Sequence, residues 1–131
     1  MGKTFKVKEI VPGTCEGPPL VIDQYISFLG EVDPEKGVLK SNKGEISLKG
    51  KVLVFRGTRG STVGPYIIYG LRLSGNNPVC MIVKEIEPIL IAGCVLANIP
   101  LYIVEEYDHF VGEACKSRFL TVRNGVVTLS V

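Results

Sequence analysis

The stretch GKVLVFRGTRGSTVGPYIIYGL, residues 50–71, decides the fold. Its apolar, partly β-branched run Val52–Phe55 predicts a buried strand. The chain then enters a glycine-rich turn, GTRGST at 57–62, and a helix-like apolar pattern follows. This order gathers backbone N–H groups, a helix N-terminus, an arginine and a serine hydroxyl around one small concavity. Such a concavity suits a carboxylate or a phosphate.

The segments on either side of the turn differ in pattern. Upstream, turns separate short apolar runs, and strands are expected at Phe5–Val11, Leu20–Ile22, Tyr25–Leu29, Val38–Lys40 and Val52–Phe55. Downstream, helices are expected at about 63–74, 88–98 and 107–115, and strands at 79–83, 101–104, 118–122 and 126–130. Strands that alternate with helices indicate an α/β fold with a parallel sheet and crossover helices. No repeat or linker interrupts the sequence, so one domain over residues 1–131 is expected.

Two of the expected helices have informative ends. The first is expected to pack one apolar side on the sheet, made by Val63, Ile67, Ile68 and Leu71. Ser61 or Thr62 is its natural N-cap, and Gly75 is its expected stop. The second is expected to begin at Pro88, directly after Glu87. It is apolar nearly all round, which predicts either deep burial or partial cover by a partner.

The composition narrows the class of protein. Hydrophobic residues make up 46% and charged residues 21% of the chain, and the mean hydropathy is +0.29. Part of this apolar excess is expected to form surface that another chain covers. The 15 basic and 13 acidic residues give a net charge of +2, which argues against a nucleic-acid-binding face. Neither a signal peptide nor a spanning apolar stretch is visible, so a cytosolic location is expected.

The positions of the cysteines and of the single histidine do not match the spacing of a metal site. The four cysteines, Cys15, Cys80, Cys94 and Cys115, form no CxxC pair, and their irregular spacings disfavour zinc or an iron–sulfur cluster. Cys80 and Cys94 lie in apolar runs and are expected to be small buried hydrophobes. Disulfides are not expected in a cytosolic chain. His109 is expected on the surface of a helix.

The turn matches none of the common glycine-rich motifs. It lacks the lysine and the spacing of a Walker A loop, and it is neither GxGxxG nor GxSxG. The simplest interpretation is a well-capped helix, but Arg56 and Arg59 favour an anion site, because two guanidinium groups beside one turn suit a carboxylate or phosphate. The charged residues Lys84, Glu85 and Glu87 indicate a solvated loop or, alternatively, contact with a ligand or partner at a strand end.

Three blocks of the sequence carry a resemblance to a known family, in the family's order. They are GTCEGPPLVIDQYISFLGEVDPEKGVL at 13–39, the stretch at 50–71, and EIEPILIAGCVLANIPL at 85–101. They are similar to the family's S-F-x-G-x-V-D-P-x-x-G motif, its R/K-G-S-T-x-G turn and its E-P-I block. The chain thereby resembles the small subunits of archaeal phosphomevalonate dehydratases, within the aconitase X swivel-domain family. Residues 105–131 resemble the family only loosely.

The resemblance implies a swivelling α/β/β domain like the mobile domain of aconitase. It implies a larger partner subunit that holds an iron–sulfur cluster through its own cysteines. The pair would dehydrate (R)-5-phosphomevalonate to trans-anhydromevalonate 5-phosphate in the archaeal mevalonate route to isoprenoids. Ser61 matches the family's proton-accepting serine, and Arg59 fits the R/K position. Arg59, Gly60 and Thr62, with Arg56, are expected to hold the substrate's carboxylate or phosphate.

Ser61 is not expected to act as a base in this chain alone. A helix N-terminus contributes at most ~2 kcal/mol, roughly 1.5 pKa units, which is too little to ionise a serine near neutral pH. Activity is therefore expected only with the partner. Two alternatives stay open: a related dehydratase subunit for a hydroxyproline or another hydroxy acid, and a non-enzymatic anion-binding or phosphocarrier module. A phosphocarrier would place a histidine in the glycine turn, whereas the single histidine is at 109.

Overall fold

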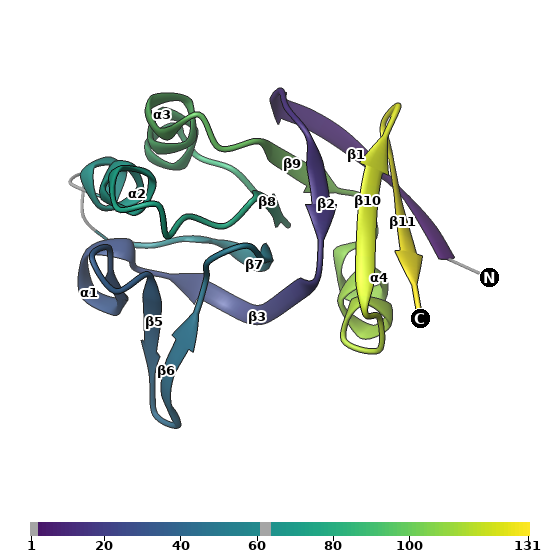
Figure 1. Cartoon of the computed structure of the whole chain (residues 1–131). Coiled ribbons are helices and arrows are strands. Elements are labelled where there is room, and N and C mark those ends of the chain that lie inside the picture. The colour runs from purple at the N-terminus through teal and green to yellow at the C-terminus, as the bar shows by residue number, and fades with distance from the viewer. Residues whose placement is uncertain (1–2, 61–63) are drawn as a thin grey trace.

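The strand that leads into the glycine-rich turn is buried on both of its faces. In the computed structural model, which describes residues 3–60 and 64–131, this strand is β7 (Val52–Thr58). It pairs in parallel with β3 (Pro19–Ile26) on one side and with β8 (Cys80–Val83) on the other. β8 in turn pairs in parallel with β9 (Leu101–Val104). The predicted parallel sheet is confirmed (Figure 1).

Two crossover helices connect these parallel strands. α2 (Gly64–Leu73) runs between β7 and β8, α3 (Pro88–Ala97) runs between β8 and β9, and both cover the same face of the sheet (Figure 1). α3 begins at Pro88 with Glu87 as its N-cap, as predicted. Ile68 and Leu71 of α2 are buried, also as predicted. Residues 61–63, which include the predicted cap of this helix and its predicted first residue, lie outside the described residues, so the cap is not tested.

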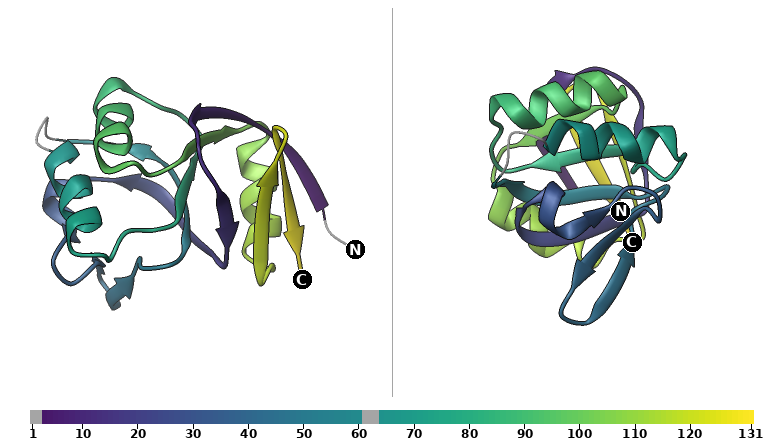
Figure 2. Two further views of the ribbon diagram at one scale, coloured as in Figure 1. Left: turned by 45° about the horizontal axis from the view of Figure 1, so that its top comes forward. Right: turned by 90° about the vertical axis from the view of Figure 1, so that its left-hand side faces the viewer.

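A second layer of antiparallel strands covers the other face of the parallel sheet. Its strands are β1 (Lys3–Val11), β2 (Cys15–Gly17), β10 (Phe119–Arg123) and β11 (Val126–Ser130), and the helix α4 (Tyr107–Ala114) packs in the same core. β1 joins the two layers, because its residues 3–6 pair with β11 and its later residues pair with β9. The chain thus forms helices, a parallel sheet and an antiparallel layer, which is the predicted α/β/β architecture (Figure 2).

Alternate side chains of β7 enter two separate cores. Leu53 and Phe55 pack in the core under α2 and α3, whereas Val52 and Val54 pack in the core against α4 and the antiparallel layer. All four side chains are 0% exposed. A strand that is apolar on both faces needs cover on both sides. The three-layer arrangement therefore follows from the composition of this strand.

One predicted strand is partly helical. The strand expected at Tyr25–Leu29 is wrong in its second half, because β3 ends at Ile26 and a short helix, α1 (Phe28–Glu31), follows. The Glu31 carboxylate accepts a hydrogen bond from the Ser27 N–H at 2.7 Å. This side-chain bond satisfies a backbone donor at the start of the helical turn. The apolar sequence pattern of this segment does not indicate the short helix.

Several short strands were not predicted from the sequence pattern. β4 (Val32–Asp33), β5 (Val38–Ser41) and β6 (Gly44–Ser47) form a small antiparallel sheet, of which only β5 was predicted. β2 was also not predicted, and the two strands expected around residues 20–29 are one strand, β3, up to Ile26. Strands of two to four residues hold too few alternating positions for periodicity to indicate them.

The expectation of reduced cysteines is wrong for two of them. Cys15 in β2 and Cys80 at the start of β8 form a disulfide across the second core, with their Cα atoms 5.4 Å apart. They are 65 residues apart in sequence, so only the meeting of the two layers brings them together. Cys94 is a buried hydrophobe as predicted, and burial raises the pKa of its thiol to about 12. Cys115 is exposed.

One face of α3 is buried and the other is apolar and exposed. Leu90 and Cys94 are 0% exposed, whereas Val95 and Leu96 are 61% and 50% exposed. The all-round apolar character of this helix therefore reflects one core face and one face that is left open. None of the helices formed by the described residues is long and apolar enough to cross a membrane.

We expect reduction of the Cys15–Cys80 disulfide to lower the free energy of unfolding by about 4 kcal/mol, the value for a crosslink that closes a loop of this length. Urea unfolding with and without reductant measures this loss. Thiol titration in denaturant should find only Cys94 and Cys115 before reduction. Four reactive thiols before reduction would contradict the disulfide. Cys115→Ser is the control and should change stability by less than about 0.5 kcal/mol.

Candidate active site

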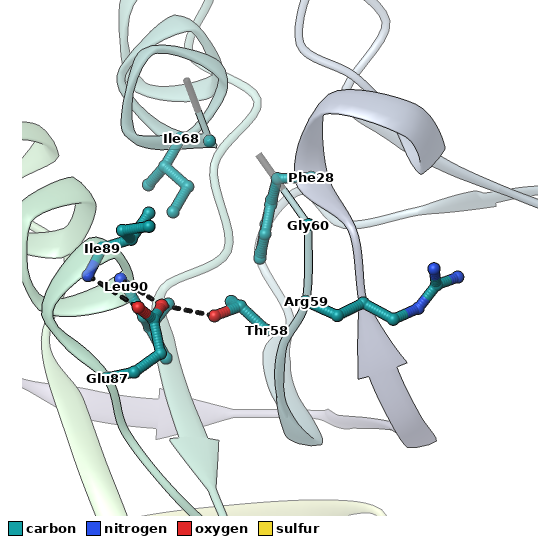
Figure 3. A pocket seen from close by; sticks show the side chains of 9 residues that line it. Phe28, Thr58, Arg59, Gly60, Ile68, Glu87, Ile89 and Leu90 are labelled. Atoms are coloured by element: carbon teal, nitrogen blue, oxygen red, sulfur yellow. Dashed lines mark hydrogen bonds between the residues drawn. The ribbon is translucent and has the colours of Figure 1, made fainter. Parts of the chain in front are cut away.

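A small pocket opens at the carboxyl ends of β7 and β8 (Figure 3). Its volume is about 140 Å³. Apolar side chains from α1, α2 and α3 form much of its wall: Phe28, Ile68, Ile89 and Leu90. Its polar part comes from Thr58, Glu87 and the turn at Arg59–Gly60. The carboxyl ends of parallel strands are where open α/β sheets bind ligands, so this position agrees with the site predicted at the glycine-rich turn.

Glycines allow the elements around the pocket to approach closely. Gly60 has a φ of +99°, and a Cβ there would lie 2.9 Å from Ser27 Oγ. A Cβ at Gly93 of α3 would lie 2.6 Å from Ile68 Cδ1 of α2. A side chain at either position would need its neighbour to move, and at Gly60 it would also strain the backbone. Gly60 thus lets the turn lie close to Ser27, and Gly93 lets α3 lie close to α2.

Glu87 is the charged group inside the pocket. Its carboxylate accepts hydrogen bonds from the backbone N–H of Ile89 at 2.9 Å and of Leu90 at 2.8 Å, and so caps α3. Its Oε1 also accepts a hydrogen bond from the Thr58 hydroxyl at the end of β7 (Figure 3). Burial raises the pKa of Glu87, but these three hydrogen bonds together outweigh burial and hold the pKa below its ordinary value. The group is therefore a carboxylate at neutral pH.

Arg59 contributes its backbone to the pocket but turns its guanidinium away. Figure 3 shows the side chain leaving the pocket on the far side of the turn. Its Nη2 lies 3.1 Å from Glu31 Oε1, and the Arg59 side chain is 62% exposed. The Arg59 N–H donates to the Ile26 carbonyl at 3.1 Å, which ties the turn to the end of β3. The arginine is thus beside the predicted site, held by a neighbouring acid.

Arg56 does not lie at the pocket. Its Nε is 2.9 Å from Asp23 Oδ1, its Nη2 is 3.7 Å from Asp108 Oδ1, and its guanidinium lies 5.5 Å from the Tyr107 ring centroid. These partners belong to β3 and α4, on the face opposite α2 and α3. The expectation that Arg56 and Arg59 flank one anion site is therefore corrected. Arg56 points toward Asp23 and α4, whereas Thr58, at the end of β7, reaches the pocket.

The predicted catalytic residue falls in the gap of the described chain. Ser61 and Thr62 lie outside the described residues. The residues that precede and follow the gap, Gly60 and Gly64, both line the pocket. The roles assigned to Ser61 and Thr62 stay predictions.

The profile of the aconitase X swivel domain matches residues 4–126. The chain belongs to the aconitase X swivel-domain family. The chain is 51% identical over 98 residues to the phosphomevalonate dehydratase small subunit of Aeropyrum pernix, covering 75% of this chain and 71% of that protein. It is 43% identical over 116 residues to the protein of the same name from Archaeoglobus fulgidus, covering 86% of each.

Solved structures agree with this aconitase X swivel-domain assignment. A chain of Thermococcus kodakaraensis aconitase X in its holo form is similar with a TM-score of 0.82 and 34% identity, over 99% of this chain and 100% of that one. A UPF0107 protein solved by solution NMR has a TM-score of 0.85 and 38% identity, over 98% of this chain and 100% of that one. The predicted family and fold are confirmed.

The described part of this swivel domain does not fit an iron–sulfur cluster. Among residues 3–60 and 64–131, no three His, Cys, Asp or Glu side chains gather into a possible metal site. Cys15 and Cys80 are joined to each other, and Cys94 is buried with its Sγ 3.8 Å from Met81 Sδ. His109 is exposed on α4, as predicted, with its ring edge-on to Phe5.

Glu87 is the site residue that sequence reasoning weighted too little. Of the charged residues at 84, 85 and 87, the first two are exposed, as a solvated loop requires. Glu87 instead lines the pocket beyond the end of β8, while the predicted alternative of contact with a ligand or partner is not tested. Two signals pointed to it: an acid directly before Pro88 at a helix start, and its place after the buried strand β8.

We expect Glu87→Gln to lower the free energy of unfolding at pH 7 by about 1 kcal/mol, the usual value for a helix cap. A glutamine amide nitrogen cannot accept from the Ile89 N–H, so one backbone donor of α3 loses its partner. Because the folded state holds the Glu87 pKa low, the carboxylate stabilises the fold above its ordinary pKa of about 4.3. This contribution is lost as the pH falls through the lower, folded-state pKa.

Urea unfolding of the wild type and the Glu87→Gln variant between pH 7 and pH 2.5 measures the effect. The difference in stability should be largest near neutral pH and should shrink in acid. A difference that stayed constant across this range would show that the charge of Glu87 does not contribute.

Proposed function

We propose that this chain is the small subunit of a heteromeric hydro-lyase that dehydrates (R)-5-phosphomevalonate to trans-anhydromevalonate 5-phosphate. The observation that carries the proposal is the 51% identity over 98 residues to the Aeropyrum pernix protein of that name. The reaction would serve the archaeal mevalonate route in the cytoplasm. A disulfide is compatible with that compartment, because intracellular proteins of hyperthermophilic archaea are often rich in disulfides.

Dehydration beside a carboxylate needs a base and help for the leaving group. In our proposal Ser61 accepts the proton from the carbon next to the substrate carboxylate. The hydroxyl on the neighbouring carbon leaves and takes up a proton as water, which leaves a double bond between the two carbons. The large subunit would hold an iron–sulfur cluster that supplies a Lewis acid for the leaving hydroxyl. This chain would supply the base and part of the anion site.

The charges around the pocket indicate where an anionic substrate group can bind. Glu87 already occupies the N-terminus of α3, so a carboxylate or phosphate would be repelled there. The turn amides at Gly60 and Thr62, together with Arg59, remain the expected anion site. Arg59 can exchange Glu31 for a substrate oxygen at small cost, because exposed ion pairs contribute only about 0–1 kcal/mol.

The large subunit would cover apolar surface that the isolated chain exposes. Tyr66 and Leu73 of α2 are 71% and 69% exposed, and Val95 and Leu96 of α3 are also open. These residues belong to the two helices that also wall the pocket. A stable complex buries about 1,600 Å² in total. We expect at least this area between the two subunits.

Co-expression with the large subunit encoded in the same genome tests the proposal. The purified complex should show iron–sulfur absorbance and should convert 5-phosphomevalonate, whereas the isolated chain should be inactive. Turnover of a hydroxyproline but not of 5-phosphomevalonate would favour the related dehydratase. Two subunits that elute separately at micromolar concentration would overturn the heteromeric proposal.

The role of Ser61 has its own test. Ser61→Ala in the reconstituted complex should lower kcat by about 10²–10⁴-fold, the range for loss of a positioned acid–base group. A residue that only caps α2 would instead cost about 1 kcal/mol of stability with nearly normal turnover. Intact subunit binding and cluster absorbance in the variant are the controls. Turnover within about threefold of wild type, far short of the acid–base range, would rule out Ser61 as the base.

A further inference from the structure

One hydrogen bond connects two segments of the pocket that are 29 residues apart. Thr58 is the last residue of β7, and its hydroxyl donates to Glu87 Oε1 at the start of α3. The same carboxylate accepts from the Ile89 and Leu90 backbone amides. The end of β7 is thereby bonded through one side chain to the first turn of α3 (Figure 3).

The bond from Thr58 is not needed to cap the helix. The two amide hydrogen bonds already satisfy the donors that an N-cap residue serves. The Thr58 hydroxyl adds a third bond, to an ionised acceptor in a half-buried place, where charge-assisted hydrogen bonds are stronger than neutral ones. The third bond therefore restrains Thr58 itself, the last residue of β7.

The turn is held from both sides at this point. On the β3 side, the Arg59 N–H donates to the Ile26 carbonyl at 3.1 Å. On the α3 side, Thr58 donates to Glu87. Without the second bond, β7 would still be anchored up to Phe55 by its buried side chains, but residues 58–60 would be held only from the side of β3 and α1.

We propose that Thr58 and Glu87 form a positioning pair that fixes the path of the turn at 58–60 against α3, at the edge of the pocket. The inference rests on the proposed function, because that function places the base in this turn. Neither residue is a catalytic residue here: both act through the turn. Glu87 is held as a carboxylate by the donors around it, so it serves as the fixed acceptor of the pair.

The experiment uses the reconstituted complex and four variants. Thr58→Val removes the hydroxyl but keeps the shape of the side chain and the α3 cap. Thr58→Ser keeps the hydroxyl, and Glu87→Gln weakens the acceptor. Thr128→Val is the matched control, because Thr128 is exposed on β11 and lies outside the pocket lining.

We expect Thr58→Val to lower kcat by about 10- to 100-fold, the loss that a displacement of about 1 Å can cause. Thr58→Ser should restore most of the turnover, and Thr128→Val should match wild type. The double variant Thr58→Val/Glu87→Gln should lose little more than the more damaged single variant, because both substitutions act on the same bond. Wild-type turnover for Thr58→Val, equal losses for Val and Ser, or fully additive losses would overturn the pairing.

A second measurement decides the inference without activity. In the isolated chain, amide hydrogen exchange at Arg59 should be faster in Thr58→Val and Glu87→Gln than in wild type, but not in Thr58→Ser or Thr128→Val. If the wild-type complex fails to dehydrate any substrate, the proposed function fails, and exchange alone judges the pair. Unchanged exchange at Arg59 in Thr58→Val would overturn it.

Discussion

The burial of β7 on both faces is the constraint on which the rest of the structure depends. Its four consecutive apolar residues, Val52–Phe55, are all 0% exposed. Each face needs its own apolar cover, since an open face would leave such side chains in water. The crossover helices α2 and α3 cover one face, and α4 with the antiparallel strands covers the other. β1 and the Cys15–Cys80 disulfide then connect the antiparallel strands to the parallel sheet.

The pocket lies where this buried strand ends. At Thr58 the chain leaves the sheet, and the helices that bury one face of β7 also form the pocket walls. Helix packing and the pocket are therefore linked, because Gly93 of α3 lets the pocket residue Ile68 of α2 pack closely against α3. The antiparallel layer contributes no side chain to this pocket wall among the described residues. It supports the site only by burying the far side of β7.

The charges near the pocket are balanced within the chain. Glu87 is neutralised in effect by the amides of α3, and Arg59 is paired with Glu31. The Glu87 carboxylate is half-buried and bonded to backbone N–H groups, so these bonds resist exchange with a ligand. The Arg59–Glu31 ion pair is exposed and weak, so a substrate anion can replace Glu31 as the partner of Arg59. This asymmetry supports a site in which the turn receives the anion and α3 only provides a fixed wall.

The sequence by itself determined the family, the parallel sheet and the start of α3 at Pro88, and it placed the predicted site at the glycine-rich turn. These features depend on local patterns: apolar runs, glycine and proline positions, and motifs carried in order. Tertiary structure decided which side chains meet. Thr58 and Glu87 are 29 residues apart, and the disulfide joins residues 65 apart, so no local pattern records either contact. Strand alternation sets Arg56 opposite Phe55, but only the placement of α2 and α3 on one face decides which of the two lies on the pocket side.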